Sequence, residues 1–108
     1  MSNSSNILET DLLQELQQQF DSGILMAQPC RDEIPTVWVS QDRIHAVLHY
    51  LKHDAPRPFR MLYDLTAVDE RTRVHRPDQP KSDFSLVYQL LSFDRNRMVR
   101  IKVPLESE

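Results

Sequence analysis

Apolar residues recur at helical spacing in a first stretch near the start of the chain. Thr10 or Asp11 can cap a helix through a side-chain oxygen, and Gly23 is a typical residue at a helix end. Between them lie four large apolar residues spaced for one helix: Leu12, Leu13, Leu16 and Phe20. Residues 2–6 are small and polar, so we expect a disordered tail over residues 1–8 and a helix after it.

A second helical pattern lies in the middle of the chain. Ser40, followed by Gln41 and Asp42, favours a helix start, and Pro56 and Pro58 end the pattern. Four apolar residues fall at positions i, i+3, i+4 and i+7 in between: Ile44, Val47, Leu48 and Leu51. This spacing predicts one buried stripe along an amphipathic helix.

The remaining apolar segments have the β-branched and aromatic composition of strands. They are residues 24–28, 36–40, 60–68, 84–93 and 98–105. The first two can pair across the connection 29–35, and the last two can pair across a short polar turn at residues 94–97. We therefore expect two antiparallel hairpins.

The last segment has the clearest strand pattern. From residue 99 to residue 105, apolar side chains alternate with Arg, Lys and Pro, which predicts one core face and one wet face. The element order is αββαβββ. This order predicts an α+β fold, an antiparallel or mixed sheet of about five strands with two helices packed on one face. We expect residues 9–108 to form this single domain.

Composition excludes several classes of function. The 108 residues include 13 Lys and Arg against 16 Asp and Glu, and this net charge of −3 argues against nucleic acid as a partner. The single glycine, Gly23, leaves no glycine-rich loop to bind phosphate or a dinucleotide. The longest apolar run, residues 24–27, is too short to cross a bilayer, so any membrane association is indirect. Cys30 is the only cysteine, which excludes an internal disulfide and fits a reduced intracellular compartment.

Three histidines stand four residues apart on the predicted second helix: His45, His49 and His53. Two imidazoles on adjacent turns can chelate a transition metal. Catalytic zinc, however, takes a third protein ligand, and the apolar stripe of this helix lies on another face. We interpret the histidines as a solvated helix face rather than a metal site.

Asp64, Asp69 and Glu70 form a carboxylate group near the end of the third strand. Paired carboxylates can act as acid and base in hydrolases, which requires an environment that raises the pKa of one of them. The sequence offers no glycine-lined or aromatic pocket for this. The favoured interpretation is that Asp64 makes a local hydrogen bond and that the other two pair with Arg71 or Arg73.

Cys30 and Trp38 each have two interpretations. Arg31 beside Cys30 is a cation that could lower the pKa of the thiol, but a free thiol in a loop is the simpler interpretation. Trp38 could anchor an interface. A large ring between Val37 and Val39 is more typical of packing against a helix of its own domain.

The connection between the third and fourth strands, residues 69–82, is long for a compact domain and dense in charge. Acidic and basic residues crowd around Pro77 and Pro80, so the segment is nearly neutral overall and buries little apolar surface. We expect it to be mobile in the isolated chain. It is the first candidate for a partner-binding segment.

Four segments carry a resemblance to a known family: PTVWVS at 35–40, MLYDLTAVDERTRVHR at 61–76, DFSLVYQLLSFDRNR at 83–97 and IKVPL at 101–105. In order and spacing they resemble the C subunit of bacterial NADH:quinone oxidoreductase, respiratory complex I, particularly the proteobacterial form in which the C and D subunits are fused in one chain. A further family pattern, a tryptophan before E-R-E and F-G-I and then H-P-x-L-R-R, would lie beyond Glu108. We therefore expect this chain to be the front part of a longer subunit.

The resemblance implies a non-catalytic structural subunit of the peripheral arm, supporting electron transfer from NADH to quinone in a proton-translocating complex. It implies no cofactor in this chain, because NADH, flavin, iron–sulfur clusters and quinone belong to the rest of the complex. The implied partners are other peripheral-arm subunits, especially the cluster-carrying B subunit and the D subunit. The implied location is the cytoplasmic side of the bacterial inner membrane, peripheral and without direct insertion.

We expect partner contacts at charged residues of the long connection and of the last turn: Asp69, Glu70, Arg71, Arg73, Arg76, Asp94, Arg95 and Arg97. The alternative is a free-standing small protein-binding module that uses the charged loop 69–83. A third interpretation is a small metal-dependent or hydrolytic enzyme.

Overall fold

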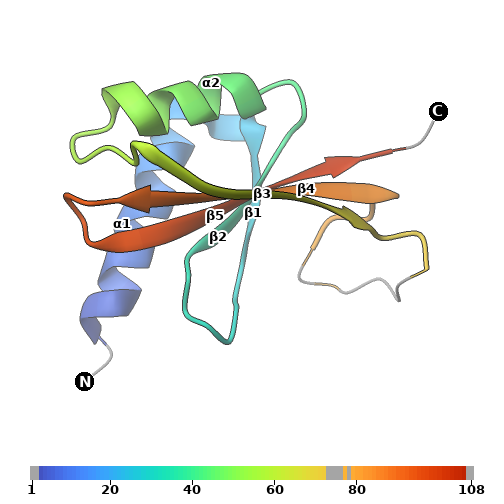
Figure 1. The fold of residues 1–108 in the computed structure, drawn as a ribbon, viewed down its shortest axis with the longest axis horizontal. Coiled ribbons are helices and arrows are strands. Elements are labelled where there is room, and N and C mark those ends of the chain that lie inside the picture. The colour runs from blue at the N-terminus through green and yellow to red at the C-terminus, as the bar shows by residue number, and fades with distance from the viewer. Residues whose placement is uncertain (1–2, 73–76, 78, 107–108) are drawn as a thin grey trace.

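The computed structural model describes residues 3–72, 77 and 79–106, with side chains from residue 12 onwards. The helices and strands of this part are shown in Figure 1. In chain order they are α1 (Asn3–Phe20), a 3-10 turn (Asp21–Gly23), β1 (Ile24–Gln28), β2 (Thr36–Val39), α2 (Ile44–His49), a π-helical turn (Tyr50–Asp54), β3 (Met61–Asp69), β4 (Phe84–Ser92) and β5 (Arg97–Leu105).

The strands form one mixed sheet in the order β1-β2-β5-β4-β3. β1 pairs antiparallel with β2, and β3, β4 and β5 form an antiparallel meander. β2 and β5 are parallel neighbours and join these two halves. The predicted α+β class, the element order and the mixed sheet are confirmed.

The helices and the sheet share one hydrophobic core. Leu12 and Leu16 from α1, Val47 from α2 and Leu51 from the π-helical turn are almost completely buried. They pack in one cluster with strand residues: Ile24, Val37, Val39, Leu90, Val99 and Ile101. The predicted stripe of the second helix is confirmed, because Ile44 and Leu48 also pack against this cluster.

The first helix begins earlier than predicted. α1 begins at Asn3 rather than at Thr10 or Asp11, so it includes residues expected to belong to the tail. Serine and asparagine disfavour a helix by only a few tenths of a kcal/mol each, and neither proline nor glycine occurs before Gly23. The helix can therefore extend back from its packed apolar residues.

Gly23 follows α1 as predicted, but its conformation is not the left-handed one that usually selects glycine at a helix end. A Cβ built on Gly23 would lie 2.7 Å from Cγ of Arg43. The constraint at this position is therefore the close approach of the Arg43 side chain.

The ring of Trp38 is fully buried, but not against a helix as the sequence suggested. Val37 and Val39 belong to the core that the helices cover, and side chains alternate along a strand. Trp38 therefore faces the opposite side of the sheet, where its indole N–H donates a hydrogen bond to Gln28. Along β5 the predicted alternation is present, since Val99, Ile101 and Val103 are buried and the residues between them are only half-buried.

Val103→Asp tests the assigned core face of β5. Val103 is fully buried, so the substitution places a carboxylate in an apolar environment. We expect the free energy of unfolding to fall by at least about 3 kcal/mol in urea denaturation followed by circular dichroism. The matched control is Ala67→Asp at an exposed position of β3, with an expected loss below about 1 kcal/mol. Equal unfolding midpoints for the two variants would show that the strand face is wrongly assigned.

Candidate functional site

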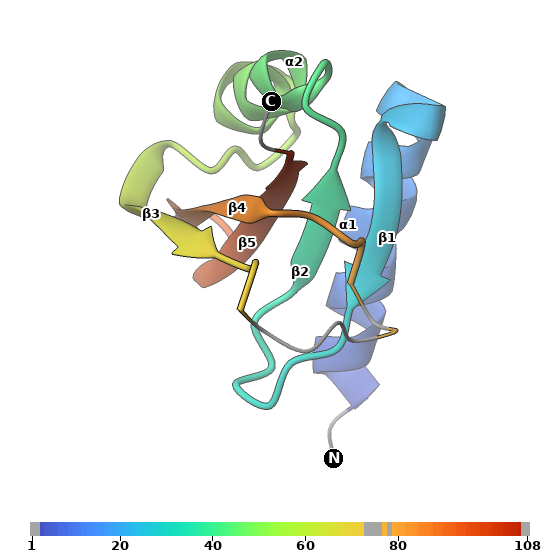
Figure 2. The same cartoon turned by 90° about the vertical axis from the view of Figure 1, so that its right-hand side faces the viewer.

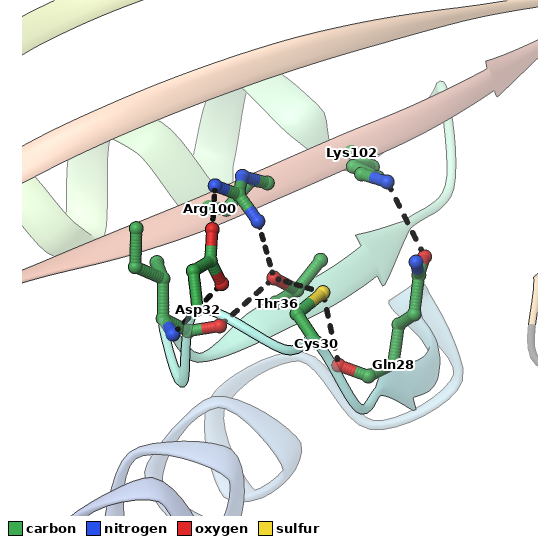
Figure 3. Close-up of polar contacts among 7 residues, drawn as sticks. Gln28, Cys30, Asp32, Thr36, Arg100 and Lys102 are labelled. Atoms are coloured by element: carbon green, nitrogen blue, oxygen red, sulfur yellow. Dashed lines mark hydrogen bonds and ion pairs between the residues drawn. The ribbon is translucent and has the colours of Figure 1, made fainter.

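A polar cluster joins the β1–β2 connection to β5 (Figure 3). It lies on the sheet face opposite the core, because its strand residues alternate with the core residues Val37 and Ile101. The parallel register places Thr36 beside Arg100, which brings the arginine to the base of this connection. Nη2 of Arg100 donates a hydrogen bond to Oδ2 of Asp32 at 2.7 Å, and Nη1 lies 3.5 Å from Oγ1 of Thr36. The Arg100 hydrogen bond lowers the pKa of Asp32, and in return Asp32 raises the pKa of Arg100.

The rest of the cluster continues the same chain of contacts. The Cys30 thiol donates to Oγ1 of Thr36 at 3.3 Å, and this hydroxyl donates to the carbonyl of Ile34 at 3.0 Å. Oε1 of Gln28 accepts hydrogen bonds from Nε1 of Trp38 at 2.7 Å and from Nζ of Lys102 at 3.4 Å. These polar groups are engaged with one another, so the cluster fastens the connection to the sheet.

Cys30 is a half-buried free thiol, in agreement with the simpler interpretation of the sequence. The Cys30 thiol and Nη1 of Arg100 both hydrogen-bond to Oγ1 of Thr36, so the thiol is linked to a cation of β5. Because Arg100 is distant in sequence, only the parallel β2–β5 pairing could have revealed this contact.

Asp32→Asn tests the ion pair with Arg100. The folded-state pKa of Asp32 is lowered, so its contribution to stability is present above the ordinary value of 3.8 and is lost as the pH falls through the folded value. We expect the substitution to lower the free energy of unfolding by no more than about 1 kcal/mol at pH 7, since Asp32 is half exposed. On acidification, the free energy of unfolding should fall less for the variant than for the wild type. Urea unfolding at pH 7 and at pH 3 measures both effects. Glu33→Gln, at the exposed neighbouring position, should retain the wild-type pH dependence.

A second polar cluster ties the β4–β5 turn to α1. Nη2 of Arg95 lies 3.2 Å from Oε1 of Glu15, and Nε of Arg95 donates to the carbonyl of Arg57 at 2.7 Å. The guanidinium also lies 5.0 Å from the ring centre of Phe59, and only 10% of the Arg95 side chain is exposed. Arg95 was expected at a partner contact, and its guanidinium is here held within the domain.

Tyr50 completes this cluster from the π-helical turn. Its hydroxyl donates a hydrogen bond to Oε2 of Glu15 at 2.8 Å. Burial, followed by the hydrogen bond and negative charge of Glu15, raises the pKa of Tyr50 from 10.0 to about 12. The carboxylate of Glu15 thus binds one cation and one phenol at the same time.

Tyr50→Phe separates the role of this hydroxyl from that of the ring. The contribution of the hydroxyl is complete below pH 10 and is lost as the pH rises toward 12, because the folded pKa is raised. We expect the substitution to lower the free energy of unfolding by about 1–2 kcal/mol at pH 7. Between pH 10 and 12, the free energy of unfolding should decline less steeply for the variant than for the wild type. Thermal or urea unfolding across this range is the measurement. Tyr63→Phe at an exposed tyrosine is the control, and parallel profiles for Tyr50→Phe and the wild type would contradict the assignment.

The predicted contacts at the end of β3 form a separate, exposed cluster. Arg71 binds Asp69 with two hydrogen bonds, Nε to Oδ1 at 3.0 Å and Nη2 to Oδ2 at 2.9 Å, and these lower the pKa of Asp69 to about 2. The Arg71 guanidinium also lies 4.8 Å from the ring centre of Phe84. Oε2 of Glu70 accepts a hydrogen bond from Oγ of Ser85 at 2.7 Å.

The six predicted contact residues that the structure describes do not gather on one surface. Asp69 pairs with Phe84 at one end of the β3–β4 ladder, whereas the turn that carries Asp94 and Arg95 joins β4 to β5 at the other end. Asp94 is exposed and Arg97 is half-buried. Arg73 and Arg76 lie outside the described residues, as does much of the expected mobile connection.

The alternative hydrolytic and metal sites are not supported by the arrangement of the described side chains. Asp64 is bound to its own strand, with Oδ1 accepting from the Leu65 amide at 2.9 Å and Oδ2 from the Thr66 hydroxyl at 3.3 Å. The rings of His49 and His53 lie 4.8 Å apart, centre to centre, on an exposed face. Across residues 3–72, 77 and 79–106, no group of three His, Cys, Asp or Glu side chains is arranged to hold a metal ion.

Sequence reasoning did not single out the outer edge of β3. β3 is an edge strand of the sheet, and nearly all of its residues are exposed. Four large apolar residues of this strand are about half exposed to solvent: Met61, Leu62, Tyr63 and Leu65. Apolar residues on both faces of a strand are typical of a central strand, so the sequence pattern of β3 did not indicate an edge position.

Residues 37–108 match the family described as the 30 Kd subunit of respiratory-chain NADH dehydrogenase. The chain belongs to this family. It is 53% identical over 104 residues to the C/D subunit of NADH-quinone oxidoreductase from Nitrosospira multiformis, covering 89% of this chain and 17% of the relative. Its identity to the C/D subunit from Acidiphilium cryptum is 62% over 78 residues, covering 72% of this chain and 13% of that relative. The resemblance seen in the sequence is therefore confirmed.

A third relative, the C/D subunit of NADH-quinone oxidoreductase from Proteus mirabilis, is 41% identical over 105 residues, covering 97% of this chain and 17% of the relative. The chain thus spans about one sixth of the length of the curated relatives it matches. Within the described part of this family member, no helix is long and apolar enough to cross a membrane.

Proposed function

We propose that this chain is a non-catalytic structural subunit in the peripheral arm of a proton-translocating NADH:quinone oxidoreductase. Its membership of the 30 Kd subunit family, over residues 37–108, is the observation that carries the proposal. In this role it supports electron transfer from NADH to quinone by holding neighbouring subunits in place. NADH, flavin, iron–sulfur clusters and quinone are bound by the other subunits.

The polar clusters support a structural role. The Arg100–Asp32 pair fastens the β1–β2 connection to β5, and the Arg95–Glu15 pair fastens the last turn to α1. Each cluster links elements that are far apart in sequence. Its side chains satisfy one another, so these clusters stabilise the domain rather than bind a substrate.

The proposed neighbours are the cluster-carrying B subunit and the D subunit, on the cytoplasmic side of the inner membrane. The relatives carry the name C/D, which supports an association with the D subunit. The Asp69–Arg71 pair, with 46% and 56% of the two side chains exposed, is available to a neighbouring surface. Partly desolvated ion pairs give an interface specificity and register more than affinity.

A second candidate is a free-standing protein-binding module that uses residues 69–83, and the same exposed Asp69–Arg71 pair favours it. The two candidates differ in the partner. A complex I subunit should co-purify with the peripheral arm from its own cells, whereas a free-standing module should be recovered with another protein.

Reversal of Arg71 and Arg73 to glutamate tests whether this segment is an interface. We expect the isolated double variant to remain folded, because the described contacts of Arg71 are exposed, while its incorporation into the peripheral arm decreases. Thermal melting of the isolated chain and its quantity in the purified complex should be measured for the same variant.

The control for charge is the double variant Arg31→Glu and Arg57→Glu, which changes two exposed arginines elsewhere by the same amount. Loss of folding in the Arg71 and Arg73 variant would assign these arginines to contacts within the domain. Normal incorporation would exclude the segment as an interface.

A further inference from the structure

The outer edge of β3 has the properties of a sheet edge that can accept a further strand. β3 has nine residues and pairs only with β4 among the described strands, and Figure 2 shows it at the edge far from α1. Its exposed apolar side chains are large: 52% of Leu62, 61% of Tyr63 and 51% of Leu65 are accessible to solvent. A long apolar edge of this kind readily pairs with another strand.

β3 carries a bulge but lacks most of the other devices that protect such an edge. Proteins use lysine, proline or short edge strands for this purpose. Between residues 61 and 68 the only charged side chain is Asp64, and both of its oxygens accept hydrogen bonds from its own strand. The opposite edge strand, β1, has only five residues and is followed directly by Pro29. The two edges of the sheet therefore differ, and β3 is the one open to pairing.

A bulge organises the apolar side chains of β3. Leu62 pairs with Leu90 and Leu65 with Tyr88, and the register shifts by one residue between them. Since Leu90 and Tyr88 both contact the core that the helices cover, Leu62 and Leu65 lie on the helix side of the sheet. The bulge therefore presents two leucines on the helix side of this edge, and Leu62 lies near Leu48 of α2.

A cavity of about 220 Å³ opens beside this edge, between α2 and the β3–β4 pair. Phe59, Leu90 and Leu62 contribute apolar walls, and Lys52 and Arg60 are the charged residues of the lining. The cavity exceeds the volume of about 150 Å³ that holds a benzene molecule in a protein core, so one large apolar side chain fits. Pockets that take such anchors carry much of the energy of an interface.

The charge around the cavity selects the partner. Lys52 and Arg60 are exposed, and neither side chain has a hydrogen-bond or ion-pair partner in the part of the chain that the structure describes. The lining contains two cations and no carboxylate. A segment that places an apolar side chain in the cavity therefore gains from an adjacent Asp or Glu.

We propose that the edge of β3 adds a strand from a neighbouring subunit of the complex, with a large apolar side chain in the cavity and an acidic residue against Lys52 and Arg60. Backbone hydrogen bonds to β3 supply affinity, and the cavity and its cations supply specificity. This proposal rests on the proposed function, which provides the neighbouring subunits.

A second copy of this chain fits the edge less well. Antiparallel pairing of two β3 strands about Leu65 would bring Asp69 and Glu70 of the second copy toward Arg60. Both carboxylates are already engaged, Asp69 with Arg71 and Glu70 with the Ser85 hydroxyl. A second copy therefore offers Arg60 only carboxylates that already have partners.

The test replaces Tyr63 with the photo-crosslinking residue p-benzoylphenylalanine in the assembled complex. Tyr63 is exposed and lies in the bulge, so the probe reports what covers the edge. We expect mass spectrometry to find a cross-link to a different subunit, in a peptide that contains an acidic residue beside a large apolar one. A cross-link to a second copy, or to another position within residues 1–108, would overturn the proposal.

Two variants then test the edge and the cations separately. Leu65→Lys protects the edge with a charge, and the control Leu25→Lys makes the same change on the other edge strand. The double variant Lys52→Glu and Arg60→Glu reverses the charge of the cavity, and Arg57→Glu is the control outside the lining. We expect Leu65→Lys and the cavity variant each to reduce the Tyr63 cross-link about tenfold, with unchanged melting of the isolated chain and little effect of either control.

The outcomes distinguish this inference from the function on which it rests. Absence of the chain from the complex would refute both. Incorporation of the chain without a cross-link from position 63, or with a cross-link that neither variant weakens, would refute the strand-addition site and leave the structural role intact.

Discussion

The parallel pairing of β2 with β5 holds the two halves of the domain together. Three residue pairs make this joint: Thr36 with Arg100, Val37 with Ile101, and Trp38 with Lys102. The middle pair lies in the core beneath the helices, and the outer pairs form the polar cluster on the other face. Burial on both faces explains why the four residues of β2 suffice to connect the β1–β2 hairpin to the meander.

Local sequence patterns were sufficient to locate the elements. β1 has the predicted bounds, and β4 and β5 differ from prediction by one residue at an end, because strand alternation and turn residues are local signals. The strand order was not predictable in this way. Nothing within β2 or β5 specifies the other as a parallel neighbour, so the face occupied by Trp38 and the position of β3 at the edge required the tertiary structure.

Local sequence patterns are also insufficient to predict the partners of charged residues in the candidate sites. Arg71, Arg95 and Arg100 look alike in the sequence, yet their partners are a nearby aspartate, a glutamate on α1 and an aspartate in the β1–β2 connection. Carboxylates close in sequence to an arginine could be anticipated, as for Asp69 and Arg71. Long-range pairs and a cavity built from α2, β3 and β4 depend on how the elements pack, which residue spacing does not determine.

The β2–β5 joint also sets the order in which the surface becomes covered during synthesis. Trp38 leaves the ribosome early, but Lys102, which lies over its ring, is among the last residues of the described chain to emerge. At 5–20 residues per second the interval is roughly three seconds or longer. For that time the N-terminal hairpin has an uncovered indole and an unpaired strand edge, so the nascent chain is most susceptible to aggregation, and most in need of a chaperone, before β5 is made.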